Sequence, residues 1–280
     1  MKEKHTALVT GATNGIGFEL TRKLLADGWQ VAALVRSEFR KDDRLIADSL
    51  DRGRLRTYQA DLADYGQLRT ALARIQSEER PIDVLFNNAG GSFPELLYSK
   101  QGRELHYELQ TVVPYVILME LKELLLRGTL RTVVNTSSNA FKFLKRFDPD
   151  SLDRPKSFKK LIGPYAASKL ALSLWTREIA PRLAADGILI RSADPGGNNT
   201  LRSGKNSGLP FYVKPLMKLI FPPPTHGASL LYEAAVGANK HLTGAFLSKN
   251  RPVELPFAEH GSRVLEKVSE VYGREYAAAT

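Results

Sequence analysis

The stretch that decides the fold of this chain is Thr6-Ala-Leu-Val-Thr10-Gly11-Ala-Thr-Asn14-Gly15-Ile-Gly17, close to the first residue. It joins an apolar run of strand length to a glycine-rich turn. The segment that follows has apolar residues at i, i+4 and i+8 (Ile16, Leu20 and Leu24), the spacing of one face of a helix. A strand, a glycine turn and a helix in this order predict the start of a βαβ unit.

The same alternation continues outward along the chain. Apolar runs of strand length alternate with amphipathic segments of helix length, at residues 30–36, 55–59, 82–87, 131–137 and 188–193. The unbroken apolar run 31–35 indicates a strand buried on both faces, as a parallel sheet requires. We therefore predict an α/β fold, a single doubly wound (Rossmann) parallel sheet with helices on both faces, forming one domain over residues 1–280. A last amphipathic helix is expected over 259–272.

Two segments interrupt this pattern. Residues 141–160 form a basic and aromatic insertion with seven Lys or Arg and three Asp, and residues 198–225 are predicted to form a substrate flap. Together they hold much of the formal net charge of +10. A concentrated positive field attracts phosphates, acidic lipids or anionic substrates. The alternative is a solvated face that only aids solubility.

The composition also excludes several classes. The chain has no cysteine, so disulfides and thiol nucleophiles are excluded, and its five histidines are scattered without metal-ligand spacing, so no metal is predicted. Its longest apolar stretch, 112–126, is broken by charges and is interpreted as a buried helix. The chain shows no secretory signal, so we expect a cytoplasmic protein, with peripheral membrane contact as an alternative. No recognition motif accompanies the charge, so no nucleic-acid partner is predicted.

The glycine-rich turn predicts a dinucleotide site. Glycines let a backbone approach a pyrophosphate, and the helix amino terminus offers amide donors. The residues expected to bind it are Gly11, Thr13, Asn14, Gly15, Ile16 and Gly17. After the second strand, Arg36 stands where an acid would hold the ribose hydroxyls of NAD, which favours NADP(H) over NAD(H). An ordinary solvated Arg36 is the alternative.

Proton chemistry is predicted for Tyr165, Lys169 and Ser138. Tyr165 and Lys169 are spaced i, i+4, so a helix places both on one face. An adjacent ammonium and an oxidised nicotinamide both favour the phenolate, which makes Tyr165 a usable acid or base. Ser138, expected at a strand end, is predicted to hold the substrate oxygen. A Tyr-x-x-x-Lys pair by itself usually lies on a helix surface, and only this context favours catalysis.

These motifs together resemble the short-chain dehydrogenase/reductase family. The matching segments are Thr10 to Gly17, Asp61-Leu62, Asn87-Asn-Ala-Gly90, Ser137-Ser138, Tyr165-Ala-Ala-Ser-Lys169 and Pro195-Gly196 with Thr200. The resemblance implies that Asp61 and Leu62 lie by the adenine and that Asn88, Ala89 and Gly90 line the adenosine ribose. It further implies that Pro195, Gly196 and Thr200 embrace the nicotinamide, and that Ser138 rather than Ser137 is the catalytic serine. Tyr165 and Lys169 are implied to contact the cofactor as well.

The chain also departs from that family's pattern. Gln110 stands at the position of an asparagine that helps hold a water against the lysine, and Asn198 replaces a common apolar residue. The long segment between Ser138 and Tyr165 resembles the retinol dehydrogenase branch. The family often forms homodimers, through helices that correspond to residues 103–127 and 164–185 here.

Aromatic residues bear on the substrate. The insertion and the flap hold bulky apolar side chains, which either wall a pocket for a lipophilic substrate or form plain core (Phe141, Phe143, Leu144, Phe147, Phe158, Leu209, Phe211, Tyr212, Leu216, Met217). The leading hypothesis is an NADP(H)-dependent alcohol dehydrogenase or carbonyl reductase acting on a small molecule. The rival is a non-catalytic NADP(H) sensor, motivated by Gln110 and Asn198.

Overall fold

The computed structural model describes residues 5–40, 42–198 and 221–279. Its eight strands form one sheet in the order β3-β2-β1-β4-β5-β6-β7-β8. All neighbouring strands are parallel except the pair β7 and β8. The strands are β1 (Thr6–Thr10), β2 (Gln30–Val35), β3 (Leu55–Gln59), β4 (Val84–Asn87), β5 (Thr132–Thr136), β6 (Leu189–Asp194), β7 (Phe246–Ser248) and β8 (Arg251–Val253). The predicted doubly wound parallel sheet is confirmed.

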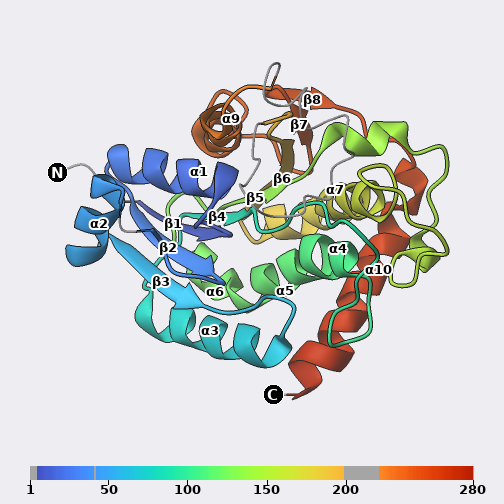
Figure 1. Cartoon of the computed structure of the whole chain (residues 1–280), viewed down its shortest axis with the longest axis horizontal. Helices are drawn as coiled ribbons and strands as arrows, with labels where there is room; N and C mark the ends of the chain where they lie inside the picture. Colours follow the sequence, from blue (N-terminus) through green and yellow to red (C-terminus); the bar gives the residue numbers. More distant parts are fainter. Residues whose placement is uncertain (1–4, 41, 199–220, 280) are drawn as a thin grey trace.

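Helices cover both faces of this sheet (Figure 1). One hydrophobic cluster joins the sheet to α1, α2 and α9, and the other joins its opposite face to α3, α5, α6, α7 and α10. The helices are α1 (Gly15–Ala26), α2 (Arg44–Asp51), α3 (Tyr65–Glu78), α4 (Leu105–Tyr107), α5 (Val113–Glu120), α6 (Lys122–Leu126), α7 (Pro164–Ala185), α9 (Pro224–Val236) and α10 (Gly261–Val271). Two clusters on opposite faces explain why the central strands β1, β4 and β5 are buried at every position.

The direction in which the chain adds strands to the sheet reverses between β1 and β4. The chain builds β1, β2 and β3 outward to one edge and then crosses back, so that β4 lies on the other side of β1. Connections on the two sides of such a point leave in opposite directions and open a crevice at the carboxyl ends of the strands. The segments after β1, β4, β5 and β6 all meet at this edge, which is where the motif residues stand.

The last two strands were not predicted. β7 and β8 form an antiparallel hairpin joined by Lys249 and Asn250, whose φ angles are 50° and 57°. Two successive left-handed residues make the tight turn whose twist suits a hairpin. Each strand has only three residues, too few for a periodic pattern. The hairpin adds an antiparallel edge to the predicted parallel sheet.

The buried helix predicted over 112–126 is broken in the structure. It is divided into a π-helical turn (Glu108–Val112), α5 and α6. The pitch changes at the π turn, and Leu121 ends α5 with φ −100° and ψ 9°. The final helix was predicted well, since α10 lies within the expected range 259–272. It packs along α7 (Figure 1), one of the helices expected to pair in a dimer.

The insertion mixes core and surface. Phe141 and Phe147 are buried in the main cluster, whereas Phe143 is 72% exposed. The seven basic side chains of the insertion are all exposed.

Most of the predicted flap lies outside the described residues, namely residues 199–220 with Thr200, Leu209, Phe211, Tyr212, Leu216 and Met217. Within the described ranges, no helix combines the length and the apolar character that a membrane crossing needs.

Candidate active site

Glycines bring the first loop of the site close to its neighbours. Gly11 has a φ of +67°, and a Cβ there would lie 2.9 Å from the Ala89 Cα. A Cβ on Gly17 would lie 2.3 Å from the carbonyl oxygen of Gly11. Helix α1 starts directly after Asn14, whose side chain makes no capping hydrogen bond. Its first amides are therefore available to an anion, and the loop fits the pyrophosphate of a dinucleotide.

Thr10 fastens the loop after β4 to the end of β1. Its Oγ1 accepts hydrogen bonds of 2.9 Å from the backbone N–H groups of both Asn88 and Ala89. The Asn88 side chain donates to the Thr10 carbonyl at 3.1 Å. The predicted residues Asn88, Ala89 and Gly90 thus lie beside the glycine loop. The sequence interpretation assigned no role to Thr10, because these bonds join residues far apart in the chain.

The predicted adenosine side lies at the ends of β2 and β3. Arg36 follows β2 with an exposed side chain, and its carbonyl accepts a bond of 3.1 Å from Gln59. Asp61 is half-buried and accepts from the Ala63 N–H, while Leu62 is buried in the core. Leu62 therefore packs into the core, whereas the Arg36 side chain is exposed and that of Asp61 is half-buried.

Ser138, Tyr165 and Lys169 meet at the end of β5. Tyr165 and Lys169 stand one turn apart on α7, and Ser138 follows β5 and caps a short 3-10 helix by accepting from the Ala140 N–H. The Ser138 and Tyr165 side chains are hydrogen-bonded. Lys169 is 4% exposed and donates from Nζ to the Thr136 carbonyl at 2.6 Å. The structure therefore brings together the three residues predicted to carry the proton chemistry.

Ser137 points away from this cluster. Its hydroxyl is buried against α7, 2.7 Å from the Ser173 Oγ, and donates to the Lys169 carbonyl at 3.1 Å. It therefore fastens α7 to the sheet. Of the pair, only Ser138 interacts with the Tyr165 side chain.

The electrostatics of the cluster differ from the sequence-based expectation. Burial raises the pKa of Tyr165, the hydrogen bond with Ser138 lowers it, and the charge of Asp194 raises it. Burial lowers the pKa of Lys169 to about 7, against the opposing effect of Asp194. The expectation that the ammonium favours the phenolate is therefore wrong for the protein alone, because removal from water penalises the phenolate more. The phenol is kept neutral.

Two predicted residues are bonded to loops instead. The Gln110 side chain donates to the Gly91 carbonyl at 3.1 Å and packs against Gly90, so its amide faces the loop after β4. Its Oε1 is buried without a hydrogen-bond partner among the described residues. Asn198 donates to the carbonyl oxygens of Pro195 and Gly196 and accepts from Gly227 at 2.9 Å. It holds the loop after β6 against α9.

A histidine that the motifs did not indicate lies beside Tyr165. The His106 ring lies edge-on to it with centroids 5.9 Å apart, and the Phe93 and Phe158 rings contact His106 at 4.7 and 6.5 Å. His106 Nε2 accepts from the Phe93 N–H at 2.9 Å, so its Nδ1–H donates to Glu104, 2.6 Å away. Both nitrogens are thereby used, which fixes the ring beside the phenol.

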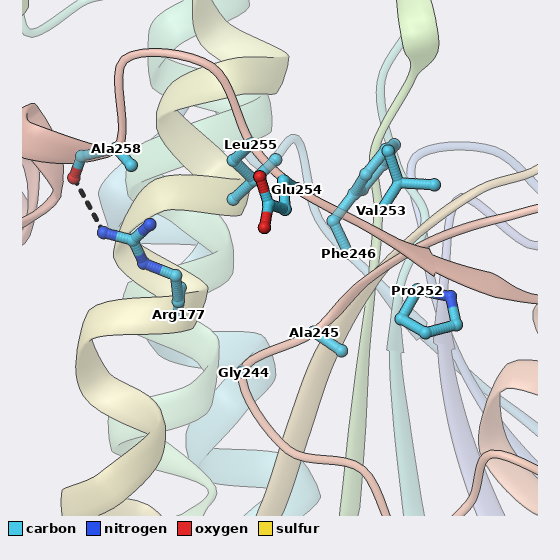
Figure 2. A pocket seen from close by; sticks show the side chains of 9 residues that line it. All are labelled: Arg177, Gly244, Ala245, Phe246, Pro252, Val253, Glu254, Leu255 and Ala258. Carbon is cyan, nitrogen blue, oxygen red and sulfur yellow. Dashed lines mark hydrogen bonds between the residues drawn. The ribbon is translucent and has the colours of Figure 1, made fainter.

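A separate cavity of about 510 Å³ lies at the other end of α7. It opens between α7, Leu255 and the β7–β8 hairpin, and Arg177 crosses its rim to the Ala258 carbonyl (Figure 2). None of the predicted site residues lines it. Elsewhere, the described part of the chain holds no group of three His, Asp or Glu side chains arranged for a metal ion.

Comparison with known proteins identifies the family of this chain. The family model for short chain dehydrogenase matches residues 5–145. This chain belongs to the short-chain dehydrogenase family. As a member, it is an oxidoreductase of alcohol and carbonyl groups of small molecules. Human retinol dehydrogenase 14 is 28% identical over 95% of this chain and 85% of its own length, and polyprenol dehydrogenase from Danio rerio is 28% identical over 94% and 83%.

Solved structures share the fold of this short-chain dehydrogenase. A blue fluorescent protein from a metagenomic library, solved with NADPH, is 26% identical with a TM-score of 0.65, over 87% of this chain and 95% of that one. An oxidoreductase of Brucella ovis, solved with a partially ordered NAD, is 22% identical with a TM-score of 0.59, over 88% and 99%. The two similar folds hold different cofactors, so likeness alone does not select one.

Proposed function

We propose that this short-chain dehydrogenase transfers hydride between NADP(H) and a lipophilic alcohol or carbonyl compound, with Tyr165 as the proton donor and acceptor. The observation that carries the proposal is the meeting of Tyr165, Ser138 and the buried Lys169 at the carboxyl end of β5. Three polar side chains gathered in a crevice at the strand ends are typical of an active site.

The residues divide the proton chemistry among them. The bound nicotinamide supplies or accepts the hydride. The neutral Tyr165 phenol donates its proton to the carbonyl oxygen during reduction, and Ser138 holds that oxygen by a second hydrogen bond. Lys169 has a pKa of about 7, so its ammonium charge depends on pH in the neutral range. When charged, it stabilises the phenolate left after the proton has moved.

The cofactor preference rests on Arg36. An exposed guanidinium directly after β2 suits the 2′-phosphate that distinguishes NADP(H) from NAD(H). For Arg36→Ala we expect the ratio of kcat/KM with NADPH to that with NADH to fall by about tenfold or more, since one charge-assisted contact is lost. Arg146→Ala, an exposed arginine of the insertion, is the control. An unchanged ratio in Arg36→Ala would contradict the preference.

The substrate class rests on the rings beside Tyr165. The His106 ring lies beside the phenol, and the Phe93 and Phe158 rings pack on His106, so an aromatic cluster extends away from Tyr165. The names of the two curated relatives, a retinol and a polyprenol dehydrogenase, both denote long isoprenoid alcohols. We therefore infer a lipophilic substrate. A panel of short and long aliphatic and isoprenoid aldehydes tests this, and a preference for the short, polar members would contradict it.

The decisive experiment replaces the phenol. Tyr165→Phe removes the hydroxyl and keeps the ring, so we expect NADPH oxidation to fall by about a hundredfold or more across the carbonyl panel, with NADPH binding nearly unchanged. Tyr98→Phe, at a half-exposed tyrosine outside the site, is the matched control. Retained turnover in Tyr165→Phe would refute the mechanism. NADPH binding without turnover in the wild type would instead favour the non-catalytic NADP(H) sensor. The residues that motivated the sensor, Gln110 and Asn198, are hydrogen-bonded to loops of the site.

We further propose peripheral contact with anionic membranes through the insertion. Its seven basic side chains are exposed, and Phe143 beside them is 72% exposed. Co-sedimentation with phosphatidylserine vesicles, lost in Phe143→Asp, is the expected result. Equal binding to neutral and to anionic vesicles, or unchanged binding of the variant, would contradict it.

Homodimer formation through the segments 103–127 and 164–185 also remains a prediction. A mass measured by light scattering that corresponds to a monomer would contradict it.

A further inference from the structure

The end of β6 carries a carboxylate that the motif residues do not account for. Asp194 is 7% exposed and directly precedes Pro195-Gly196. Along β6, Ile190 packs into the core on the α7 face, whereas Ala193 packs into the core on the α1 face. Because side chains alternate along a strand, Asp194 faces the α7 side. It therefore lies on the face of the sheet that carries Tyr165 and Lys169.

Hydrogen bonds tie Asp194 to the site on two sides. One carboxylate oxygen accepts from the Gly196 N–H at 3.1 Å, and the other accepts from the Asn139 side chain. Asn139 directly follows Ser138 and also donates to the Ser248 hydroxyl on β7 at 2.7 Å. A donor on each oxygen favours the ionised carboxylate over the acid. Asp194 thus joins the loop after β6 to the turn that carries Ser138.

The charge of Asp194 acts on the reacting groups. It raises the pKa of both Tyr165 and Lys169, so the carboxylate is electrostatically close to each. The pKa of Asp194 itself is raised above its ordinary value, because burial outweighs the hydrogen bonds from Gly196 and Asn139 and the charge of Lys142, which lower it. The donors on both of its oxygens support the ionised form of Asp194, so the site holds a buried carboxylate beside two groups that can each gain or lose a proton.

We propose that Asp194 makes the cofactor pocket discriminate between the oxidised and the reduced nicotinamide in favour of the oxidised form. This inference rests on the proposed function. Hydride transfer requires the nicotinamide ring to lie against the carbon whose oxygen Ser138 and Tyr165 hold, and Asp194 is bonded to the neighbour of Ser138. The oxidised ring carries a positive charge that the reduced ring lacks. A buried carboxylate nearby attracts only the charged form.

The test compares two charge-removing variants by binding. Asp194→Asn keeps the shape of the side chain, and Asp150→Asn removes an exposed carboxylate that pairs with Arg263 on the surface. Dissociation constants for NADP⁺ and NADPH are measured separately by titration calorimetry. We expect the dissociation constant for NADP⁺, divided by that for NADPH, to rise by about tenfold in Asp194→Asn. The reason is that the variant loses the attraction between the carboxylate and the positive ring, which is worth about this factor in a partly screened site. It stays unchanged in Asp150→Asn.

The outcomes separate the two proposals. An unchanged ratio in Asp194→Asn, with both nucleotides bound, would overturn the role of Asp194 and leave the proposed function standing. A wild-type protein that binds neither nucleotide would overturn both. If the amide variant does not fold, Asp194→Ser removes the same charge with a smaller side chain and is measured in its place.

Discussion

At the scale of single residues, one loop of the candidate site has a position that only glycine fits. Gly90 has a φ of +145°, and a Cβ there would lie 2.8 Å from the Gln110 Cγ. Gln110 is 1% exposed, so its side chain is enclosed by neighbouring residues. Gly91, the next residue, has nothing within 4 Å of its would-be Cβ. Two adjacent glycines of one loop therefore have very different tolerance for a side chain.

This difference predicts the effect of a single methyl group. Gly90→Ala is expected to lower the free energy of unfolding by about 1–3 kcal/mol, through backbone strain and the contact with Gln110. Gly91→Ala, the matched control, should change it little. The double variant Gly90→Ala with Gln110→Ala should recover part of the loss, because the contact disappears while the strain stays. Urea unfolding measures all four proteins, and equal losses at both glycines would contradict the steric argument.

At the scale of elements, a buried polar cluster joins the start of the π-helical turn to α3 and the segment after α10. Arg103 donates to Glu108 at 2.7 Å, to the Tyr65 hydroxyl at 2.8 Å and to Glu275. Glu108 is fully buried and also accepts from Tyr65 and Ser99. One guanidinium thus fixes where three elements meet, and its partner Glu108 lies two residues before Gln110.

Removal of this guanidinium leaves the Glu108 carboxylate buried without its counter-charge. Arg103→Ala is expected to lower the free energy of unfolding by about 3–5 kcal/mol, as for other broken buried ion pairs. Lys100→Ala is the control, because Lys100 pairs with Asp64 at the exposed surface and water screens that pair. A small effect of Arg103→Ala in chemical denaturation, similar to that of the control, would show that the cluster is not coupled to stability.

At the scale of the whole molecule, the central strands are held together by one carboxylate at their amino ends. Asp83 precedes β4 and accepts from the Thr6 N–H at the start of β1, and from the N–H and hydroxyl of Thr129 before β5. Burial raises the pKa of Asp83, but these hydrogen bonds, together with the charge of His5, outweigh it and lower the pKa below its ordinary value of 3.8. The stability of the sheet is therefore linked to pH.

The sign of this linkage follows from the lowered pKa. The stabilisation that Asp83 provides is complete above the pKa of this carboxyl group in the unfolded chain. It is lost as the pH falls through the lower pKa that the group has in the folded protein. At pH 7, Asp83→Asn should lower the free energy of unfolding by about 1–3 kcal/mol, since an amide oxygen cannot replace both carboxylate oxygens. The difference from the wild type should shrink below pH 3.8, where the wild-type carboxylate also takes up its proton. Denaturation curves at several pH values check this, and a constant difference would contradict it.

Particular residues show how far sequence interpretation reaches. All six strands expected from apolar runs are present, with ends within two residues of the prediction, because a buried parallel strand needs a continuous apolar run. The three-residue strands β7 and β8 were missed because they are too short for any pattern. The pKa of Tyr165 was expected to fall and is raised instead, since burial cannot be read from the spacing of two residues.

The sequence by itself determined the alternation of the first six strands with helices along the chain, the glycine loop and the placement of Tyr165 and Lys169 on one helix face. These features depend on periodicity and on residues a few positions apart. Only the tertiary structure decided that Asp194 bonds to Asn139, that His106 lies against Tyr165 and that Gln110 turns to Gly91. Such contacts join residues 19 to 59 positions apart, and they exist only once packing of the helices on the sheet has brought those segments together.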